Sequence, residues 1–113
     1  MRYILVCGGR DYADRNRMTE VLSERLNEGD TVVHGGAPGA DALAGDIAGR
    51  VLGHTVVVHP ADWATHGKAA GPIRNQKMLD SHPIDELIAF PGGRGTQDMV
   101  RRAQDAGVKI TLV

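Results

Sequence analysis

Three clusters of glycine are the parts of this sequence best suited to chemistry. The chain holds 15 glycines, nearly twice the ~8 that an average usage of about 7% gives for this length. The clusters are Gly8-Gly9-Arg10-Asp11, Gly35-Gly36-Ala37-Pro38-Gly39-Ala40-Asp41 and Gly92-Gly93-Arg94-Gly95-Thr96. Glycine adopts positive φ and lets the backbone approach a ligand closely, so that successive N–H groups can bind an anion. We therefore expect these loops to bind phosphate or carboxylate.

Arginines and aspartates accompany these loops. The guanidinium groups of Arg10, Arg74 and Arg94 suit phosphate, which they can hold through two parallel N–H donors. Asp41 is expected to cap the helix that follows it, and Asp41 or Asp62 can also accept a hydrogen bond from a ribose hydroxyl. Together these side chains predict a site for an anionic ligand that carries hydroxyl groups.

Other chemistries receive less support from the sequence. Trp63 either stacks on a base or covers the edge of the core. Cys7, His34 and His59 each end a predicted strand, which suggests a metal site or a Cys–His nucleophile pair, but no two of them have the spacing of metal ligands. We therefore predict no metal. The sequence also contains neither G-x-x-x-x-G-K-[ST] nor G-x-G-x-x-G, which disfavours a P-loop NTPase and an ordinary NAD-dependent dehydrogenase.

Short apolar runs alternate with amphipathic stretches along the whole chain. The runs predict strands over Arg2–Cys7, Thr31–His34, Thr55–His59, Glu86–Phe90 and Lys109–Val113. Helices are expected between Asp14 and Gly29, from Leu43 to Val51, from Pro72 to Leu79, and from a Thr96 cap to Gly107. Helical connections join parallel strands, which predicts a three-layer, Rossmann-like α/β fold with helices on both faces of a five-stranded parallel sheet, in the order 3-2-1-4-5. All three glycine loops then meet at the carboxyl edge of that sheet.

Length, charge and composition limit the class of protein and its partners. A chain of 113 residues fits one domain over 1–113, and one cysteine forms no internal disulfide. Thirteen lysines and arginines against 14 aspartates and glutamates disfavour a duplex nucleic acid partner. No run approaches the ~18 apolar residues of a membrane span, and the apolar start is too short for a signal peptide. We expect a cytoplasmic protein.

Five motifs in succession resemble the YspA-like family of the SLOG superfamily. They are Gly8-Gly9-Arg10-Asp11-Tyr12, His34-Gly35-Gly36-Ala37-Pro38-Gly39-Ala40-Asp41, Pro60-Ala61-Asp62-Trp63, Arg74-Asn75-Gln76-Lys77-Met78 and Ala89-Phe90-Pro91-Gly92-Gly93-Arg94-Gly95-Thr96. The resemblance implies a Rossmann-like domain that binds a nucleoside monophosphate or an ADP-ribose- or NAD-like molecule and requires no cofactor. Relatives of this kind often dimerise, so a homodimer is among the expected assemblies.

The resemblance and the loops together give a set of expected ligand contacts. These are Gly8, Gly9, Arg10, Asp11, Gly35, Gly36, Gly39, Asp41, Asp62, Trp63, Arg74, Asn75, Gly92, Gly93, Arg94, Gly95 and Thr96.

Two further functions follow from superfamily relatives. LOG phosphoribohydrolases cleave the N-glycosidic bond of nucleoside monophosphates and share the arginine at Arg74 and the loop before Thr96. Asn75 stands where they have lysine, and Met99 stands where they have glutamate. A hydrolase of this kind would have Arg74 and Asp98, or alternatively Arg74 and Asp11, as its catalytic residues. The second of these functions is single-stranded nucleic-acid binding, as in DprA. Such binding uses a series of aromatic side chains that stack on bases, and this chain has few of them.

Overall fold

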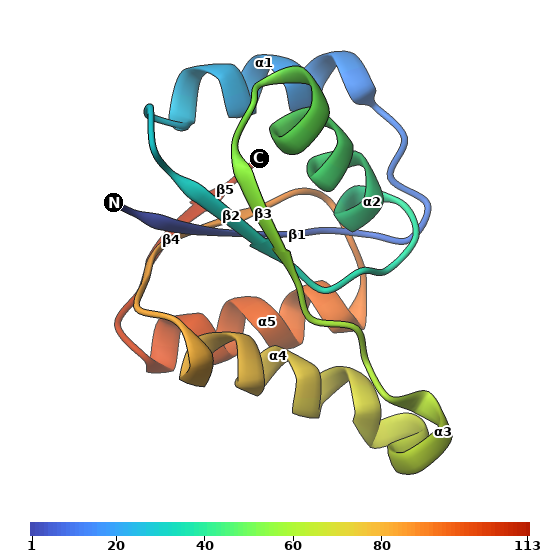
Figure 1. The fold of residues 1–113 in the computed structure, drawn as a ribbon. Coiled ribbons are helices and arrows are strands. Elements are labelled where there is room, and N and C mark those ends of the chain that lie inside the picture. The colour runs from blue at the N-terminus through green and yellow to red at the C-terminus, as the bar shows by residue number, and fades with distance from the viewer.

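The computed structural model describes residues 1–113 and contains one five-stranded sheet (Figure 1). The strands are β1 (Tyr3–Cys7), β2 (Thr31–His34), β3 (Thr55–Val58), β4 (Ile84–Ala89) and β5 (Lys109–Leu112). All neighbouring strands are parallel, in the order β3-β2-β1-β4-β5. The predicted α/β class and strand order are therefore confirmed.

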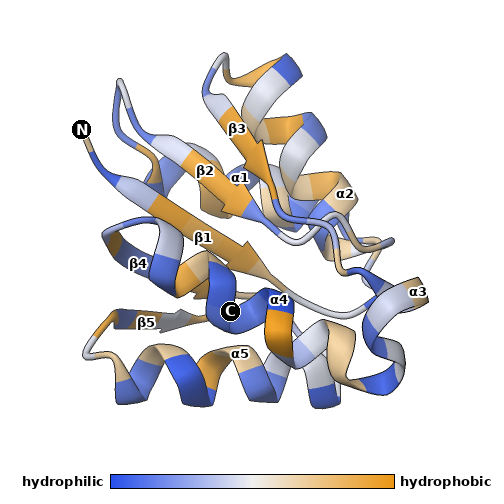
Figure 2. Ribbon diagram, turned by 60° about the horizontal axis from the view of Figure 1, so that its bottom comes forward, coloured by the Kyte–Doolittle hydropathy of each residue, from blue (hydrophilic) through white to orange (hydrophobic).

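Helices cover both faces of the sheet, as predicted (Figure 1). One face carries α1 (Arg15–Arg25), α2 (Ala40–Gly45) and a π-helical segment, η1 (Asp46–Val51), and the other carries α4 (Ala70–Ser81) and α5 (Arg94–Asp105). Alternate residues of a strand point to opposite faces. Ile4 and Val6 of β1 accordingly pack in one core cluster, and Leu5 and Cys7 pack in the other. Figure 2 shows the resulting apolar central strands between helices with hydrophilic outer surfaces.

Several elements differ from the sequence-based prediction. The second predicted helix changes to π geometry at Asp46, and Val51, expected on its buried face, is 51% exposed. A short helix, α3 (Trp63–His66), and a 3-10 turn, η2 (Gly67–Ala69), occupy a segment for which no element was predicted. In Figure 1 this segment projects beyond the sheet beside the start of α4. No helix combines the length and the apolarity that crossing a membrane requires.

The sequence-based prediction of two N-cap residues, Asp41 and Thr96, is wrong. Thr96 lies inside the first turn of α5, because that helix begins at Arg94 after Gly93, and Gly93 offers no side-chain cap. Asp41 lies in the first turn of α2, whose N-cap is Gly39 with φ +77°. At Gly39 the positive φ, which other residues rarely adopt, provides the turn that starts α2. Gly93 has no side chain with which to cap α5.

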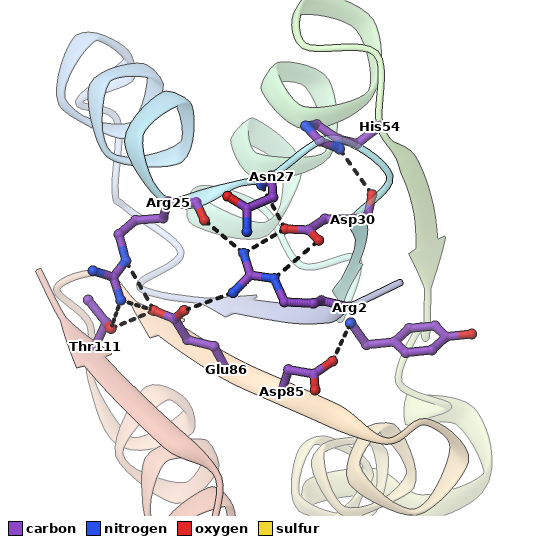
Figure 3. Close-up of polar contacts among 9 residues, drawn as sticks. Arg2, Arg25, Asn27, Asp30, His54, Asp85, Glu86 and Thr111 are labelled. Atoms are coloured by element: carbon purple, nitrogen blue, oxygen red, sulfur yellow. Dashed lines mark hydrogen bonds and ion pairs between the residues drawn. The ribbon is translucent and has the colours of Figure 1, made fainter.

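A network of ion pairs joins the sheet to α1, near the amino ends of β1 and β2 (Figure 3). The guanidinium of Arg2 donates to the carboxylate of Asp30, at an Nη2–Oδ2 distance of 2.8 Å. Arg25 donates to Glu86, and the Thr111 hydroxyl donates to the same Glu86 oxygen over 2.6 Å. The side chains of Asp30 and Glu86 are 2% and 3% exposed. This end of the sheet is therefore closed by charged groups that satisfy one another.

Candidate anion-binding site

A cavity of about 730 Å³ lies at the carboxyl ends of β1 and β4, where the strand order reverses. Ligands of parallel α/β sheets bind at this place. Its lining includes the expected residues Gly8, Gly9, Arg10, Gly35, Asp41, Trp63, Arg74, Asn75, Gly93, Arg94, Gly95, Thr96 and Asp98. Asp11, Gly36, Gly39, Asp62 and Gly92 were also expected at the ligand but do not line the cavity.

The glycines of these loops serve two different purposes. A Cβ atom at Gly39 would collide with the carbonyl oxygens of Gly9 and Arg10, and one at Gly92 would collide with the backbone nitrogen of Gly9 and the side chain of Thr96. These two glycines let neighbouring loops pack against each other. A Cβ at Gly93 or Gly95, by contrast, would meet no atom within 4 Å. At those two positions the bare backbone faces open space, where a ligand can approach it closely.

The amino end of α5 supplies backbone donors to the cavity. Gly93, Arg94, Gly95, Thr96 and Gln97 all line the cavity. The first N–H groups of an α-helix have no partner within the helix, and α5 has no side-chain cap to satisfy one of them. The helix dipole adds partial positive charge at this end. The 12-residue helix α5 thus presents N–H donors that suit an anion.

The cavity also collects the cations that have no carboxylate partner. Seven of the 13 lysines and arginines form salt bridges within 4.0 Å. The other six include Arg10, Lys68, Arg74 and Arg94, and these four line the cavity. Only two carboxylates line it, those of Asp41 and Asp98. The charge balance of the cavity is therefore positive, although the chain as a whole carries −1.

Arg74 is held in place by neighbouring groups on two sides. Its Nη1 donates to the carbonyl oxygen of Gly35, and its Nε donates to Oδ1 of Asn75 over 3.0 Å. Burial lowers the pKa of the Arg74 guanidinium, whereas the nearby charge of Asp41 acts in the opposite direction. Nη2 makes no hydrogen bond within the chain. Arg74 therefore offers the cavity a fixed guanidinium with donor capacity to spare.

Asn75 joins α4 to α5 and has no donor left for a ligand. This side chain is 5% exposed, and its Nδ2 donates to Oδ2 of Asp98 over 3.0 Å and to the carbonyl oxygen of Gly95 over 3.4 Å. Its Oδ1 accepts from Arg74. The amide thus fixes the direction of the Arg74 guanidinium and the position of the first turn of α5.

Asp98, the expected catalytic acid, is occupied by hydrogen bonds from neighbouring side chains. Arg101 and Arg102 each donate to it over 2.8 Å, in addition to Asn75. Burial alone would raise the pKa of Asp98, but the hydrogen bonds from Arg102 and Asn75 outweigh it, and the pKa is lowered. Met99, which stands at the glutamate position of the LOG pattern, is 1% exposed and packs in the core.

Asp41 stabilises the loop between β2 and α2. Its Oδ2 accepts hydrogen bonds from the N–H groups of Gly35 and Ala37, both over 3.2 Å. The residue is 6% exposed, and this burial raises the pKa of its carboxyl group above the usual value, although the two hydrogen bonds and nearby charges reduce the shift. Asp62, by contrast, is exposed and caps α3 by accepting from the N–H of Thr65.

Trp63 lies at the rim of the cavity rather than over the core. Half of its surface is exposed, and the guanidinium carbon of Arg10 lies 5.6 Å from its ring centre. This distance is within the range of a cation–π interaction. The sequence allowed two roles for Trp63, stacking on a base or covering the edge of the core. Its exposed position at the rim leaves a ring face available for stacking.

The Cys–His alternative finds no support in the geometry. Burial raises the pKa of the Cys7 thiol to about 12, which keeps it protonated and unreactive. His34 is buried and accepts a hydrogen bond from the N–H of Gly36, and His59 contacts His82 with 2.8 Å between their Nε2 atoms. No group of three histidine, cysteine or acidic side chains lies close enough to hold a metal ion.

Sequence reasoning missed two cations of the cavity. Arg101, on α5, lines the cavity. Arg94, Asp98 and Arg101 follow one another at spacings of four and three residues, which places them on one face of the helix. That spacing was a usable signal. Lys68 lies in η2, where no periodicity marks an element, and only the fold brings it to the cavity.

Comparisons with known proteins identify the family. The sequence profile of the YspA, cpYpsA-related SLOG family matches residues 2–66. The chain belongs to this family. The matched segment of the SLOG family contains the first two glycine loops, whereas Arg74 and the third loop lie beyond it. Membership places the chain among nucleotide-related, Rossmann-like domains.

Two individual proteins extend the similarity beyond the matched segment. Gene 61 protein of Mycobacterium phage D29 is 41% identical over 119 aligned residues, covering 97% of this chain and 94% of the phage protein. The C-terminal domain of a hydrogenase from Pyrococcus furiosus superimposes with a TM-score of 0.57 at 15% identity, over 98% of this chain and 89% of that structure. The second likeness concerns the fold alone. It shows that the whole SLOG chain, third loop included, follows a known architecture.

Proposed function

We propose that the cavity binds a small phosphate-containing nucleotide or nucleotide-derived ligand, such as a nucleoside monophosphate or an ADP-ribose-like molecule. The observation that carries this proposal is the meeting of four unpaired cations with the uncapped amino end of α5. Backbone N–H groups and guanidinium groups are the donors that proteins use for phosphate. Membership of the SLOG family supports the nucleotide class.

The size and the rim of the cavity fit such a ligand. Pockets for small molecules range over about 300–1,000 Å³, and the volume here is about 730 Å³. The half-exposed ring of Trp63 offers one surface on which a base can stack. One such ring suits one base, whereas single-stranded nucleic acids are bound by a series of stacking side chains.

Binding is favoured over hydrolysis by the state of Asp98 and Met99, the two residues at or beside the position of the LOG glutamate. Asp98 accepts hydrogen bonds from three side chains, and its lowered pKa keeps it from donating a proton near neutral pH. Met99 has no acid–base capacity and is buried. We therefore expect a ligand that remains intact in the cavity.

Calorimetric titration of the purified protein with adenosine 5′-monophosphate (AMP), ADP-ribose and inorganic phosphate tests the proposal. Arg74→Gln should weaken nucleotide binding by roughly tenfold or more, the loss expected for a hydrogen bond to a charged group. Lys77→Gln is the matched control, because Lys77 is an unpaired cation on the same helix that does not line the cavity. Absence of binding to all three ligands at millimolar concentration would refute the proposal. Release of ribose 5-phosphate from AMP would instead establish the hydrolase.

A further inference from the structure

Asp41 has one carboxylate oxygen with no partner in the protein. Both of its hydrogen bonds, from Gly35 and Ala37, end on Oδ2, and none ends on Oδ1. Yet every side-chain oxygen that is fully shielded from solvent has a hydrogen-bond partner. Oδ1 therefore reaches solvent, although the residue is 6% exposed. Asp41 lines the cavity, so Oδ1 is the atom of this side chain that is free to accept a hydrogen bond from a ligand there.

The charge of this oxygen decides what can bind beside it. A carboxylate accepts hydrogen bonds and repels phosphate, so the phosphate belongs at α5 rather than at Asp41. An ammonium group on the ligand is disfavoured by the four unpaired cations around the cavity. A neutral donor remains. Nucleotides carry neutral donors on the sugar, as hydroxyl groups, and on the base, as amino groups, and the sugar hydroxyls are the ones closer to the phosphate.

The acceptor and the phosphate-binding arginine are held in a fixed relation. The N–H of Gly35 donates to Asp41, and the carbonyl oxygen of the same residue accepts from Arg74. A Cβ at Gly35 would collide with the Arg74 guanidinium, so the two side chains are packed tightly around this residue. A ligand that contacts both Asp41 and Arg74 therefore needs its hydroxyl group and its anionic group at the separation that these two side chains have.

We infer that Asp41 binds sugar hydroxyl groups, and that the site therefore takes ribose phosphates in preference to their deoxy counterparts. This inference rests on the proposed function, because it assigns the sugar end of the same ligand. Asp98, the other carboxylate of the cavity, is already occupied by three side-chain donors. Asp41 is thus the specificity-determining residue for the sugar.

A comparison of three phosphates tests the inference. AMP should bind the wild-type protein at least tenfold more tightly than 2′,3′-dideoxyadenosine 5′-monophosphate, since a hydrogen bond to a charged group contributes roughly this factor. Asp41→Asn should reduce the ratio to threefold or less. It should leave the affinity for methyl phosphate unchanged or tighter, because it removes a negative charge from an anion site. Asp11→Asn, an exposed carboxylate outside the cavity, should keep the wild-type ratio.

The outcomes separate this inference from the proposed function. If methyl phosphate and AMP bind but AMP and its dideoxy analogue bind within twofold of each other, sugar recognition is refuted and phosphate binding stands. If Asp41→Asn weakens methyl phosphate as strongly as AMP, Asp41 acts through the fold of the loop and the inference is again refuted. Failure of all three phosphates to bind refutes both. Should the variant fail to fold by circular dichroism, the wild-type ratio decides.

Discussion

The guanidinium of Arg10 lies 5.6 Å from the ring centre of Trp63, which places a cation of the cavity on the only tryptophan of the chain. An anion that binds Arg10 changes the charge felt by the indole, so AMP should change the intensity of Trp63 emission. Arg10→Gln should abolish most of this change in emission. The same substitution should lower the free energy of unfolding by no more than about 0.5–1 kcal/mol, which is the contribution of an exposed cation–π contact. A fluorescence titration measures the first effect and urea unfolding the second. An unaltered emission at saturating AMP would contradict the prediction.

A negative charge at Asn75 should loosen the contact between α4 and α5. In Asn75→Asp a second carboxylate faces Asp98 at the position where the amide now donates over 3.0 Å. We expect a loss of about 1–3 kcal/mol in the free energy of unfolding at pH 7, because a buried acceptor loses its donor. The loss should shrink as the pH falls and one of the two carboxyl groups becomes protonated.

The second variant for this contact is a double replacement. Adding Asp98→Asn to Asn75→Asp restores one amide and one carboxylate with their places exchanged, and should recover part of the lost stability. Urea unfolding of the four proteins gives the coupling between the two positions. Additive effects would show that the two side chains do not act on each other.

Strand order was predictable from the sequence because it depends on periodicity and topology. Compact apolar runs and alternating helices allow few arrangements, and β1 pairs with both β2 and β4 as expected. The change to π geometry at Asp46 was not predictable, since a spacing of four between Leu43, Ile47 and Val51 fits an ordinary helix equally well. The helix α3 has no buried residue and therefore no apolar pattern.

The candidate site was predictable in outline and less so in detail. Loops that follow parallel strands must meet at one edge, which brings Gly9, Gly35 and Gly93 to the same cavity. Which glycines expose their backbone and which pack against another loop depends on contacts between loops, as at Gly39 and Gly9. Arg101 and Arg102 follow Asp98 at helical spacing, so their ion pairs could be read from the sequence. The hydrogen bond from Asn75 to Asp98 depends on the packing of α4 against α5, and the bonds to Asp41 depend on the conformation of its own loop.

Glu86 should be a main contributor to stability at the amino end of the sheet. Burial alone would raise the pKa of Glu86, but hydrogen bonds from Thr111 and Arg25 outweigh it and lower the pKa. Glu86→Gln should cost about 2–3 kcal/mol in the free energy of unfolding, somewhat less than a fully buried pair because Arg25 is one-third exposed. Glu20→Gln, in the exposed pair with Arg17, is the control and should change stability by less than about 0.5 kcal/mol.

The pH dependence of the same variant follows from the direction of the shift. A carboxyl group with a lowered pKa stabilises the fold above its ordinary pKa of 4.5, and this contribution is lost as the pH falls toward the folded-state value. The difference between wild type and Glu86→Gln should therefore shrink under acidic conditions. Urea unfolding at pH 7 and at pH 3.5 measures it, and a difference that stays constant would contradict the assignment.

Asp41 should show the opposite sign, because burial raises its pKa. The folded protein holds the Asp41 proton more tightly than the unfolded chain, so ionisation destabilises the fold above the folded-state pKa. Asp41→Asn should therefore raise the melting temperature at pH 7, and the gain should disappear as the pH falls toward the ordinary value of 3.8. Calorimetry at pH 7 and pH 4 measures both. A variant less stable than wild type at pH 7 would show that the loop requires the ionised carboxylate.

The salt bridges of Arg2 and Arg25 lie near the amino ends of the strands (Figure 3), whereas the residues that line the cavity follow the carboxyl ends of the strands. Strands of this length span about 17 Å, which separates the salt bridges from the cavity. No side chain takes part in both. The salt bridges that stabilise the fold and the side chains that line the cavity are thus divided between separate parts of one small domain. Side chains at the rim can therefore be exchanged without disturbing the ion pairs that hold the strands together at the other end.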